Sequence, residues 1–271
     1  TLLADPEIEV IYNPLPNSLH AEWTIKALFA GKHVLCEKPL AVTVEQGTLM
    51  IEAARNQNKL LMEAFMYRFH PQLIWALEQI NAGRLGDIRQ VHASFAFKIL
   101  PVARSNDIRL QPELAGGSLM DVGCYPINFC RAVYGRPPLA VAARVYASEP
   151  EAVEHAACAI LDFGDGRLAQ IDSHFALPTR QVAEVIGENG MLTLLSPFVT
   201  GLHETEVILT LEGQTIHQKI LPVDAYRLEI EHFGACVRSG TTPAFRLDET
   251  LENLATLEAI YQSAGYPWPR N

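Results

Sequence analysis

The chain has 271 residues, 49% of them hydrophobic, and is therefore long enough to bury one large core or two smaller ones. Its 31 acidic residues outnumber the 21 basic ones and no basic stretch could neutralise a phosphate backbone, so nucleic acid is excluded as an expected partner. No apolar run approaches the roughly 18 residues that span a bilayer, so no membrane partner is expected either.

The first part of the chain alternates short apolar strands with helices. This alternation is typical of a parallel sheet that helices cover on both faces. We therefore expect an α/β fold in which residues 1–70 form half of a doubly wound domain. Strands are predicted at 8–16, 32–37 and 60–69, and helices at 17–31 and 43–59.

The pattern changes after about residue 70. We expect residues 71–271 to form an α+β domain with a large, mainly antiparallel open sheet, whose strands are separated by turns such as Gly164-Asp165-Gly166. Helices are predicted at 71–83, within 116–135, at 225–240 and at 248–265. Strands are predicted at 87–97, 139–147, 155–163, 167–175, 181–188, 190–196 and 206–213.

The strand at 32–37 ends on two opposite charges, Glu37 and Lys38, which precede Pro39. Ligands of open parallel sheets bind outside the carboxyl ends of the strands, so both side chains are expected to face a cleft. A surface ion pair is the alternative, but Pro39 fixes the backbone and gives the lysine a defined direction. Such a lysine can lower the pKa of a neighbouring hydroxyl, or act as a base if burial lowers its own pKa.

Three stretches carry a family resemblance: NPLPNSLHAEWTIKALFAGKHVLCEKPLA at 13–41, EAFMYRFHPQ at 63–72 and GGSLMDVGCYPIN at 116–128. Together they resemble the Gfo/Idh/MocA oxidoreductases, which are dehydrogenases of sugars, polyols and related diols. The branch that is most similar contains dimeric dihydrodiol dehydrogenases and NADP-dependent D-xylose dehydrogenases. The resemblance covers essentially the whole chain. It implies a partial Rossmann-like dinucleotide-binding domain in residues 1–70 and a substrate-binding and oligomerisation domain in residues 71–271.

The resemblance also implies roles for single residues. Lys38 matches the family lysine that lies near the reacting carbon and the nicotinamide ribose. Asp121 and Tyr125 match the family pair in DVGCY, where many members have histidine in place of the tyrosine. Arg109 resembles an arginine that faces the cofactor or the substrate. We therefore expect Lys38, Asp121 and Tyr125 to be catalytic.

The chemistry of carbinol oxidation needs the same groups. A proton leaves oxygen while a hydride leaves carbon, so the site needs a base near the hydroxyl and a cation for the developing alkoxide. Tyr125 can serve as this base or acid if Lys38 lowers the phenol pKa from roughly 10. Asp121, four residues earlier, shares a helix face with Tyr125 and would orient the substrate or keep Lys38 charged. Pro126 requires a helix that begins near Tyr125 or is kinked there. A helix-start acid and a packed aromatic are the alternative.

Two further sets of residues are expected to bind ligands. Pro16, Asn17 and His20 lie at the first turn of a predicted helix, where free backbone N–H groups favour phosphate or ribose oxygens. With Glu37, Lys38 and Arg109 they form the expected cofactor site, although Asn17 could be a simple helix cap and His20 a structural histidine. Tyr67, Arg68 and Asn128 are expected to bind the substrate.

The glycine-rich fingerprint GxGxxG is absent from this sequence, which begins with Thr1. We expect roughly 60 residues of a dinucleotide-binding domain upstream of the first strand. The predicted activity is that of an NAD(P)-dependent oxidoreductase acting on a sugar, polyol or cyclic diol, with NADP preferred by resemblance. A non-catalytic binding or assembly protein on the same scaffold is the alternative, and an epimerase or hydrolase that reuses bound NAD is a third.

Cysteine and histidine usage adds three expectations. The five cysteines contain no Cys-x-x-Cys pair, which predicts reduced thiols in a cytoplasmic protein. The nine histidines show no metal-ligand spacing, so no metal is expected. The exposed face of the second domain's sheet, with AACAIL at 156–161 and LAQIDSHFAL at 168–177, is expected to form a homodimer or higher homo-oligomer.

Overall fold

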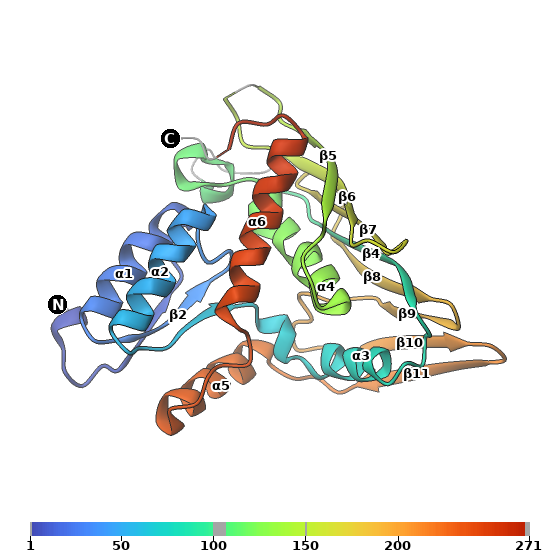
Figure 1. Cartoon of the computed structure of the whole chain (residues 1–271), viewed down its shortest axis with the longest axis horizontal. Helices are drawn as coiled ribbons and strands as arrows, with labels where there is room; N and C mark the ends of the chain where they lie inside the picture. Colours follow the sequence, from blue (N-terminus) through green and yellow to red (C-terminus); the bar gives the residue numbers. More distant parts are fainter. Residues whose placement is uncertain (1, 100–106, 150, 269–271) are drawn as a thin grey trace.

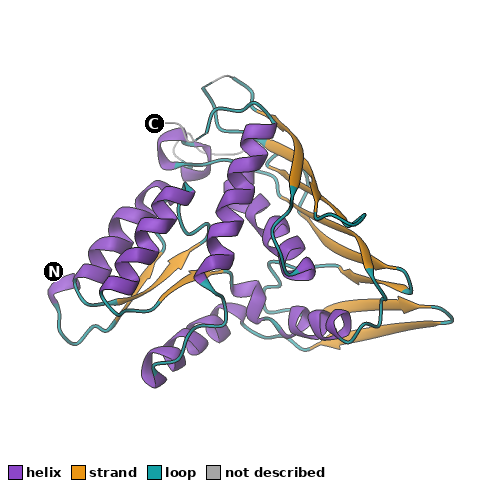
Figure 2. Cartoon of the chain, viewed as in Figure 1, coloured by secondary structure: helices purple, strands orange, loops and turns teal. Residues whose placement is uncertain are grey.

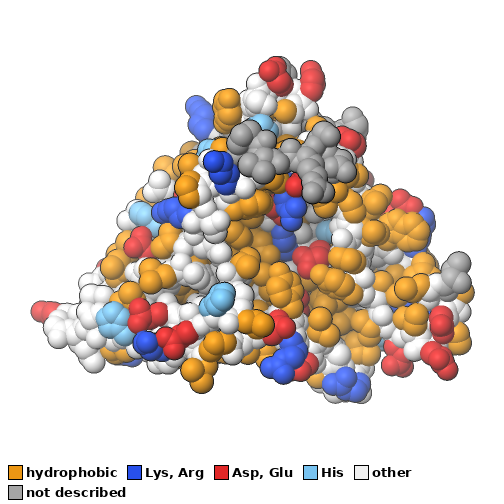
Figure 3. Space-filling model, turned by 180° about the vertical axis from the view of Figure 1, so that it is seen from behind, with side chains coloured by type: hydrophobic (Ala, Val, Ile, Leu, Met, Phe, Trp, Pro, Cys, Tyr) orange, Lys and Arg blue, Asp and Glu red, His pale blue; other side chains and the backbone are white. Residues whose placement is uncertain are grey.

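The structure, a computed structural model, describes residues 2–99, 107–149 and 151–268. It contains two β-sheets, a small parallel one and a large mixed one, with helices between and around them (Figures 1 and 2). Hydrophobic side chains lie across the middle of the face seen from behind, with acidic and basic side chains between them (Figure 3). No helix in these ranges is both long and apolar enough to cross a membrane.

The small sheet has the strand order β1-β2-β3, and its strands pair in parallel. The core of β2 is fully apolar because both faces of the sheet are covered. Helix α1 packs against β1 and β2, and α2 lies beside α1. The hydroxyl oxygen of Thr43 caps α2 by accepting a hydrogen bond from the Gln46 N–H at 3.1 Å. The elements are β1 (Val10–Asn13), α1 (His20–Phe29), β2 (His33–Glu37), α2 (Val44–Asn56) and β3 (Leu61–Ala64).

The second face of the small sheet is covered from far along the chain. Helix α5 (Ala225–Ser239) places Phe233 in a buried cluster with Leu35 of β2 and Met62 of β3. Figure 1 shows α5 on the side of β2 opposite to α1 and α2. The predicted α/β arrangement is therefore confirmed, with one covering helix that the C-terminal part of the chain supplies.

The large sheet has eight strands in the order β11-β10-β9-β8-β4-β7-β6-β5. Neighbouring strands are antiparallel except for β4 and β7, which confirms the predicted large, mainly antiparallel sheet. The strands are β4 (Ile88–Ala96), β5 (Ala140–Tyr146), β6 (Ala156–Asp162), β7 (Leu168–His174), β8 (Arg180–Gly187), β9 (Gly190–Leu194), β10 (Thr205–Leu211) and β11 (Gln214–Ile220).

Three helices cover one face of the large sheet. Helix α4 (Cys124–Tyr134) packs on β4 and β7, α3 (Pro71–Asn81) on β10, and α6 (Leu247–Ser263) on β5. Helix α6 also contacts α2, α4 and β3, so the last helix ties the two sheets together (Figure 1). One continuous apolar core therefore runs from the small sheet to the large one.

One predicted strand is longer than the observed one, and one observed strand, β11, has no counterpart among the predictions. The strand predicted at 60–69 ends at Ala64, and Met66–Phe69 form a 3-10 helix. A short apolar run does not distinguish a strand from a buried turn by its periodicity. Strand β11 was not among the predicted strands because its outward residues are polar. The hairpin signal before it is Gly213, whose φ of 72° suits a tight turn.

Candidate active site

A cleft of about 360 Å³ opens at the carboxyl ends of β1 and β2, where an open parallel sheet is expected to bind ligands. We name it the Lys38 cleft. The loops after these two strands form one wall, and residues that precede or begin α4 form the other. Its chemistry-bearing side chains are Tyr12, Glu37, Lys38, Arg109, Asp121, Tyr125 and Tyr226, and its apolar walls include Ile108, Phe95, Val122 and Val199.

Lys38 is anchored across the cleft by Asp121. Its Nζ lies 2.5 Å from the Asp121 backbone oxygen and 3.3 Å from Oδ1. Burial, the largest single influence, would lower the pKa of Lys38, but the Asp121 carboxylate, Cys124 and Glu37 together outweigh it, so the pKa is raised. Of the two roles open to this lysine, the geometry favours a fixed positive charge over a base.

Asp121 joins two cations. Besides Lys38, it accepts a hydrogen bond at Oδ2 from Arg109 Nε at 3.0 Å. Arg109 remains half exposed and also lies 3.6 Å from Asp107, so part of its guanidinium faces the open cleft. The sequence-predicted residues Lys38, Arg109 and Asp121 are thus brought together, with Asp121 keeping Lys38 charged.

Tyr125 lies in the aromatic floor of the cleft. Its ring contacts Phe65, Tyr67, Phe95 and Phe198, and its hydroxyl donates to Met66 Sδ at 3.6 Å. The Lys38 ammonium lies over the ring face, 5.0 Å from the centroid.

Burial raises the pKa of Tyr125 well above 10, and Cys124 and Glu37 add to it. The prediction that Lys38 lowers this pKa is therefore wrong for this conformation, because the ammonium faces the ring and not the hydroxyl. The phenol is a proton donor at neutral pH.

Pro126 is accommodated by the way the helix begins. A π-helical turn, Leu119–Gly123, carries Asp121 and runs directly into α4 at Cys124. Pro126 therefore falls in the first α-helical turn, where its missing N–H is tolerated. The helix begins close to Tyr125, the first of the two predicted possibilities.

Glu154 stabilises this π-helical turn through a hydrogen bond to its backbone. Sequence reasoning did not identify this residue. It is fully buried, and its Oε1 accepts from the Leu119 N–H at 2.7 Å and from the Tyr261 hydroxyl at 3.2 Å. Gly117, at φ 120°, passes so close that a Cβ would lie 2.3 Å from Glu154 Oε2. Glu154 comes from the connection between β5 and β6, and no local pattern signals so distant a contact.

The residues expected at the first helical turn have mainly internal partners. The Asn17 side chain donates to the Ala115 carbonyl at 2.8 Å, so it ties two loops together and caps no helix. His20 is fully buried between the carbonyls of Leu15 at 2.7 Å and Pro39 at 2.9 Å, and burial lowers its pKa. A neutral imidazole has one N–H, so it donates to one of the two at a time. Both residues order the loops that line the cleft.

Of the other expected cofactor residues, Glu37 lines the cleft, as Asn17 and His20 do, whereas Pro16 lines a small neighbouring pocket. Glu37 accepts a hydrogen bond from the Tyr12 hydroxyl at 2.6 Å, whereas Pro16 follows Leu15 in the loop after β1. Tyr12 could have been found from its place near the end of the first strand. Tyr226 and Val199 come from distant segments and carry no such signal.

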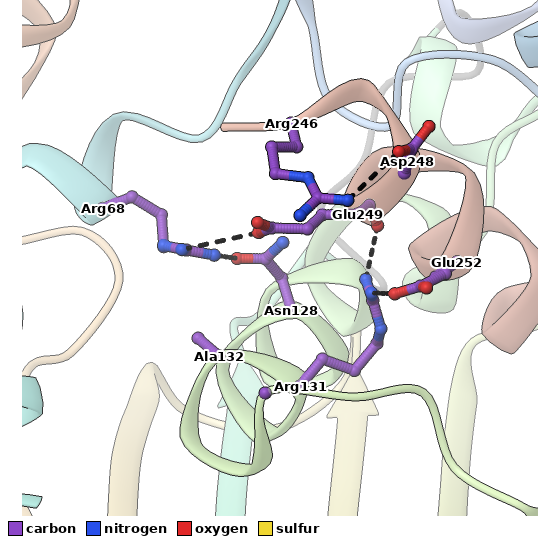
Figure 4. Close-up of a pocket in the computed structure, with 9 residues that line it drawn as sticks. Arg68, Asn128, Arg131, Ala132, Arg246, Asp248, Glu249 and Glu252 are labelled. Atoms are coloured by element: carbon purple, nitrogen blue, oxygen red, sulfur yellow. Dashed lines mark hydrogen bonds and ion pairs between the residues drawn. The ribbon is translucent and has the colours of Figure 1, made fainter. Parts of the chain in front are cut away.

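Tyr67, Arg68 and Asn128 lie together but outside the Lys38 cleft. The buried Tyr67 hydroxyl donates to Asn128 Oδ1 at 2.6 Å, while its ring contacts Tyr125. Arg68 and Asn128 line a second pocket near the start of α6 (Figure 4). That these residues bind the substrate stays a prediction. The pocket that Arg68 and Asn128 line is separated from Lys38 by Tyr67.

The titratable side chains in the described ranges form no group of three or more histidine, cysteine, aspartate or glutamate residues that could hold a metal ion. The chemistry of the cleft is thus that of an ammonium, a carboxylate, a guanidinium and a phenol. Such a set can stabilise a developing oxyanion and exchange a proton with it.

Comparisons with known proteins agree with this geometry. Residues 1–65 match the oxidoreductase family with an NAD-binding Rossmann fold, and residues 75–193 match the GFO/IDH/MocA C-terminal domain. A D-xylose 1-dehydrogenase (NADP(+)) from Haloferax volcanii is 37% identical over 97% of this chain and 80% of its own length. A trans-1,2-dihydrobenzene-1,2-diol dehydrogenase from Xenopus laevis is 34% identical over 96% and 80%.

A solved structure has the same architecture. The 3-ketoreductase from Actinomadura kijaniata, in complex with NADP and TDP-benzene, superposes with a TM-score of 0.90 at 30% identity, covering 97% of this chain and 80% of that one. The sequence matches, the fold and the cleft at the strand ends lead to one conclusion. The chain belongs to the Gfo/Idh/MocA family of oxidoreductases.

Proposed function

We propose that the protein is an NADP- or NAD-dependent oxidoreductase that transfers a hydride between a nicotinamide and a carbinol carbon of a sugar, polyol or cyclic diol. The observation that carries this proposal is the meeting of Lys38, Asp121 and Tyr125 in one cleft. NADP is the preferred cofactor because the similar D-xylose dehydrogenase and 3-ketoreductase are described with it.

The residues of the cleft suit the nicotinamide and ribose end of such a cofactor. Two of the three Lys38 N–H bonds are directed at Asp121, which leaves a third for a hydroxyl oxygen. Glu37 offers carboxylate oxygens as acceptors, Arg109 lines the same cleft, and Pro16 lines the small neighbouring pocket that Arg109 shares. When bound, the cofactor supplies the hydride or accepts it.

Proton transfer falls to Tyr125. Because its pKa is raised well above 10, the neutral phenol can donate a proton to the oxyanion that forms when a carbonyl is reduced. Its present acceptor, the Met66 thioether, is weak and is readily exchanged for a substrate oxygen. Lys38, kept charged by Asp121, stabilises the same oxyanion. In the oxidation direction Tyr125 is the base, so that direction gains rate as the pH rises.

The first test is a fluorescence titration of the chain with NADPH and NADH, followed by turnover assays with D-xylose and with a cyclic vicinal diol. We expect the nucleotide fluorescence to change until it saturates, with a lower Kd for NADPH than for NADH. We also expect oxidation of at least one of the two substrates. If neither nucleotide binds to a preparation shown to be folded by circular dichroism, the non-catalytic binding or assembly protein replaces this proposal.

We further propose a homodimer or higher homo-oligomer through the outer face of the large sheet. Tyr146, Ile160 and Leu168 lie on β5, β6 and β7, and each is more than two fifths exposed. Adjacent exposed apolar side chains on one sheet face are typical of an interface. Light scattering should give a multiple of 30.0 kDa for the chain and the monomer mass for Ile160→Glu. A monomer for both would refute the proposed interface.

Two other expectations are kept as proposals. The five cysteines are all free, which fits a reducing, cytoplasmic location. We keep the proposed boundary near residue 70 between a dinucleotide-binding part and a substrate-binding part. Helix α5 of the second part covers the small sheet of the first. Limited proteolysis tests this division, because cleavage near residue 70 should then give two fragments that stay associated.

A further inference from the structure

A second pocket, of about 250 Å³, lies where the start of α6 approaches α4 and the 3-10 helix Met66–Phe69. We name it the Arg68 pocket. Three arginines and three carboxylates line it, together with the amide of Asn128. Figure 4 shows these side chains converging from the three segments. The Lys38 cleft shares none of these residues.

Asn128 presents an unused donor to this pocket. The residue is only 6% exposed, and its Oδ1 accepts from Tyr67 at 2.6 Å and from Arg68 Nη1 at 3.2 Å. A guanidinium cannot accept a hydrogen bond, so the amide atom facing Arg68 must be the oxygen. The Asn128 nitrogen therefore points the other way, into the pocket (Figure 4), and has no partner among the described residues. This nitrogen is not among the fully buried polar atoms, so its two N–H groups are accessible to a ligand.

Arg68 and Glu249 face each other with hydrogen-bonding capacity to spare. Arg68 is held in place by the Phe245 ring, 4.5 Å from its Cζ. Its Nη2 lies 3.8 Å from Glu249 Oε2, which is an ion pair but too long for a direct hydrogen bond. Donors on one side of the pocket and acceptors on the other are thus both available to a ligand.

Arg131 gives the pocket a rigid floor. Its side chain is 5% exposed, Nη1 donates to the Glu249 backbone oxygen at 2.5 Å, and Nη2 pairs with Glu252. The backbone of Glu249 and the carboxylate of Glu252 are therefore placed by contacts that do not require a ligand. A pocket whose polar groups are fixed in advance loses little entropy on binding.

The balance of charge defines the ligand. Three positive and three negative side chains cancel, so an anion would meet Glu249 and Glu252, and a cation would meet the arginines. A hydroxyl group both accepts and donates, and therefore suits Arg68 and Asn128 on one side and Glu249 on the other. The volume lies just below the usual range of about 300–1,000 Å³ for ligand pockets, which limits the ligand to roughly one ring. We propose that the Arg68 pocket binds a neutral polyhydroxyl molecule the size of a monosaccharide.

The test uses methyl β-D-xylopyranoside as the probe, titrated without cofactor and followed by saturation-transfer NMR. We expect the probe to bind the unmodified chain, and the Lys38→Met variant to keep the binding that belongs to the Arg68 pocket, even if the Lys38 cleft also takes up the probe. Asn128→Asp replaces the donor with an acceptor of the same size, and Glu249→Gln removes the charged acceptor. Each should raise Kd by about fivefold, the value of one hydrogen bond. Arg246→Gln, at the exposed rim, should have a smaller effect.

Other results would overturn the proposal. If Lys38→Met abolishes binding while Asn128→Asp and Glu249→Gln do not, the probe occupies the Lys38 cleft only. Displacement of the probe by inorganic phosphate, with tighter binding of the phosphate, would identify an anion site. A failure to saturate up to the solubility limit would exclude the site altogether. If Asn128→Asp does not fold, Glu249→Gln decides alone, because that side chain is 42% exposed. None of these outcomes depends on hydride transfer.

Discussion

The Lys38 cleft and the Arg68 pocket lie on either side of Tyr67, yet their charges are arranged in different ways. In the cleft, one buried ammonium is held by one carboxylate beside a phenol whose pKa is raised. In the pocket, each arginine has its own carboxylate partner. The first arrangement changes the pKa of a single group. The second has no net charge, and its side chains can still form hydrogen bonds with a ligand. A buried titratable group beside a single charge has a shifted pKa, which suits proton transfer. Arginine and carboxylate side chains in equal number have no such effect, and they suit hydrogen bonding to a neutral ligand.

The largest expected effect distinguishes Tyr125 and Lys38 from similar residues elsewhere. Tyr125→Phe removes the proton donor and Lys38→Met the fixed charge, so each should lower kcat by roughly 10²- to 10⁴-fold. Tyr134→Phe on the same helix and Lys26→Met on α1, both outside the cleft, are the matched controls. Steady-state assays of the folded variants decide, and activity near that of the unmodified chain in Tyr125→Phe would contradict the assigned role.

The next effect concerns stability near the cleft. Glu229 is only 1% exposed, and burial, with a smaller contribution from Glu37, raises its pKa to about 9. Burial also raises the pKa of Glu63 to about 7. Both raised values mean that the folded chain binds protons more tightly than the unfolded one, so stability falls as the pH rises from about 4.5 to about 9.

The expected loss is on the order of a few kcal/mol, measurable as a lower Tm at high pH. Glu229→Gln should remove much of this dependence above pH 7, because glutamine cannot ionise. The exposed Glu231→Gln on the same helix should not. A Tm that is independent of pH in the unmodified chain would show that Glu229 ionises freely.

The third prediction breaks the link between Asp121 and Lys38. Asp121→Asn removes the charge that offsets burial, so the pKa of Lys38 should fall. The kcat/KM of carbonyl reduction should then begin to fall at a lower pH than in the unmodified chain. Near pH 9 it should be about tenfold lower than that of the unmodified chain. The measurement is a pH profile of kcat/KM, with Asp107→Asn as the control because Asp107 contacts Arg109 but not Lys38. An unshifted profile would mean that another group keeps Lys38 charged.

The smallest effect concerns the support of the π-helical turn. Glu154→Gln keeps the shape but replaces a charged acceptor with a neutral one, which should cost about 1 kcal/mol in urea unfolding. Since the turn carries Asp121, kcat/KM should also drop a few-fold while KM changes little. Glu151→Gln in the same connection is exposed and serves as the control. Equal stability of the two variants would assign Glu154 a smaller role.

Sequence reasoning placed Lys38 at the carboxyl end of a strand by a local rule, whereas Asp121, Tyr125 and Arg109 were singled out by the family resemblance. Lys38 follows a strand end, and Asp121 and Tyr125 are four residues apart on one helical segment. It named Arg68 and Asn128 as substrate-binding residues, but not the pocket that they line with Arg131, Arg246 and the carboxylates of α6. Whether Arg68 faces a cleft depends on where β3 stops, and this is decided by the packing of Tyr67 against Tyr125 and not by the apolar pattern.

The same limit applies to distant supports. Glu154, Val199 and Tyr226 reach the site through contacts that only the folded chain creates. The fold class followed from the strand and helix alternation, but the parallel pairing of β4 with β7 and the path of α5 did not.

Helix α5 has a consequence for recombination between family members. A crossover at residue 70 would join the first 70 residues of one protein to the remainder of another and would separate Leu35 and Met62 from Phe233, against which they pack. A chimera would also receive a foreign α6 against its own α2. Exchange of the first 70 residues by such grafting therefore requires the C-terminal helices that pack against them to be exchanged as well.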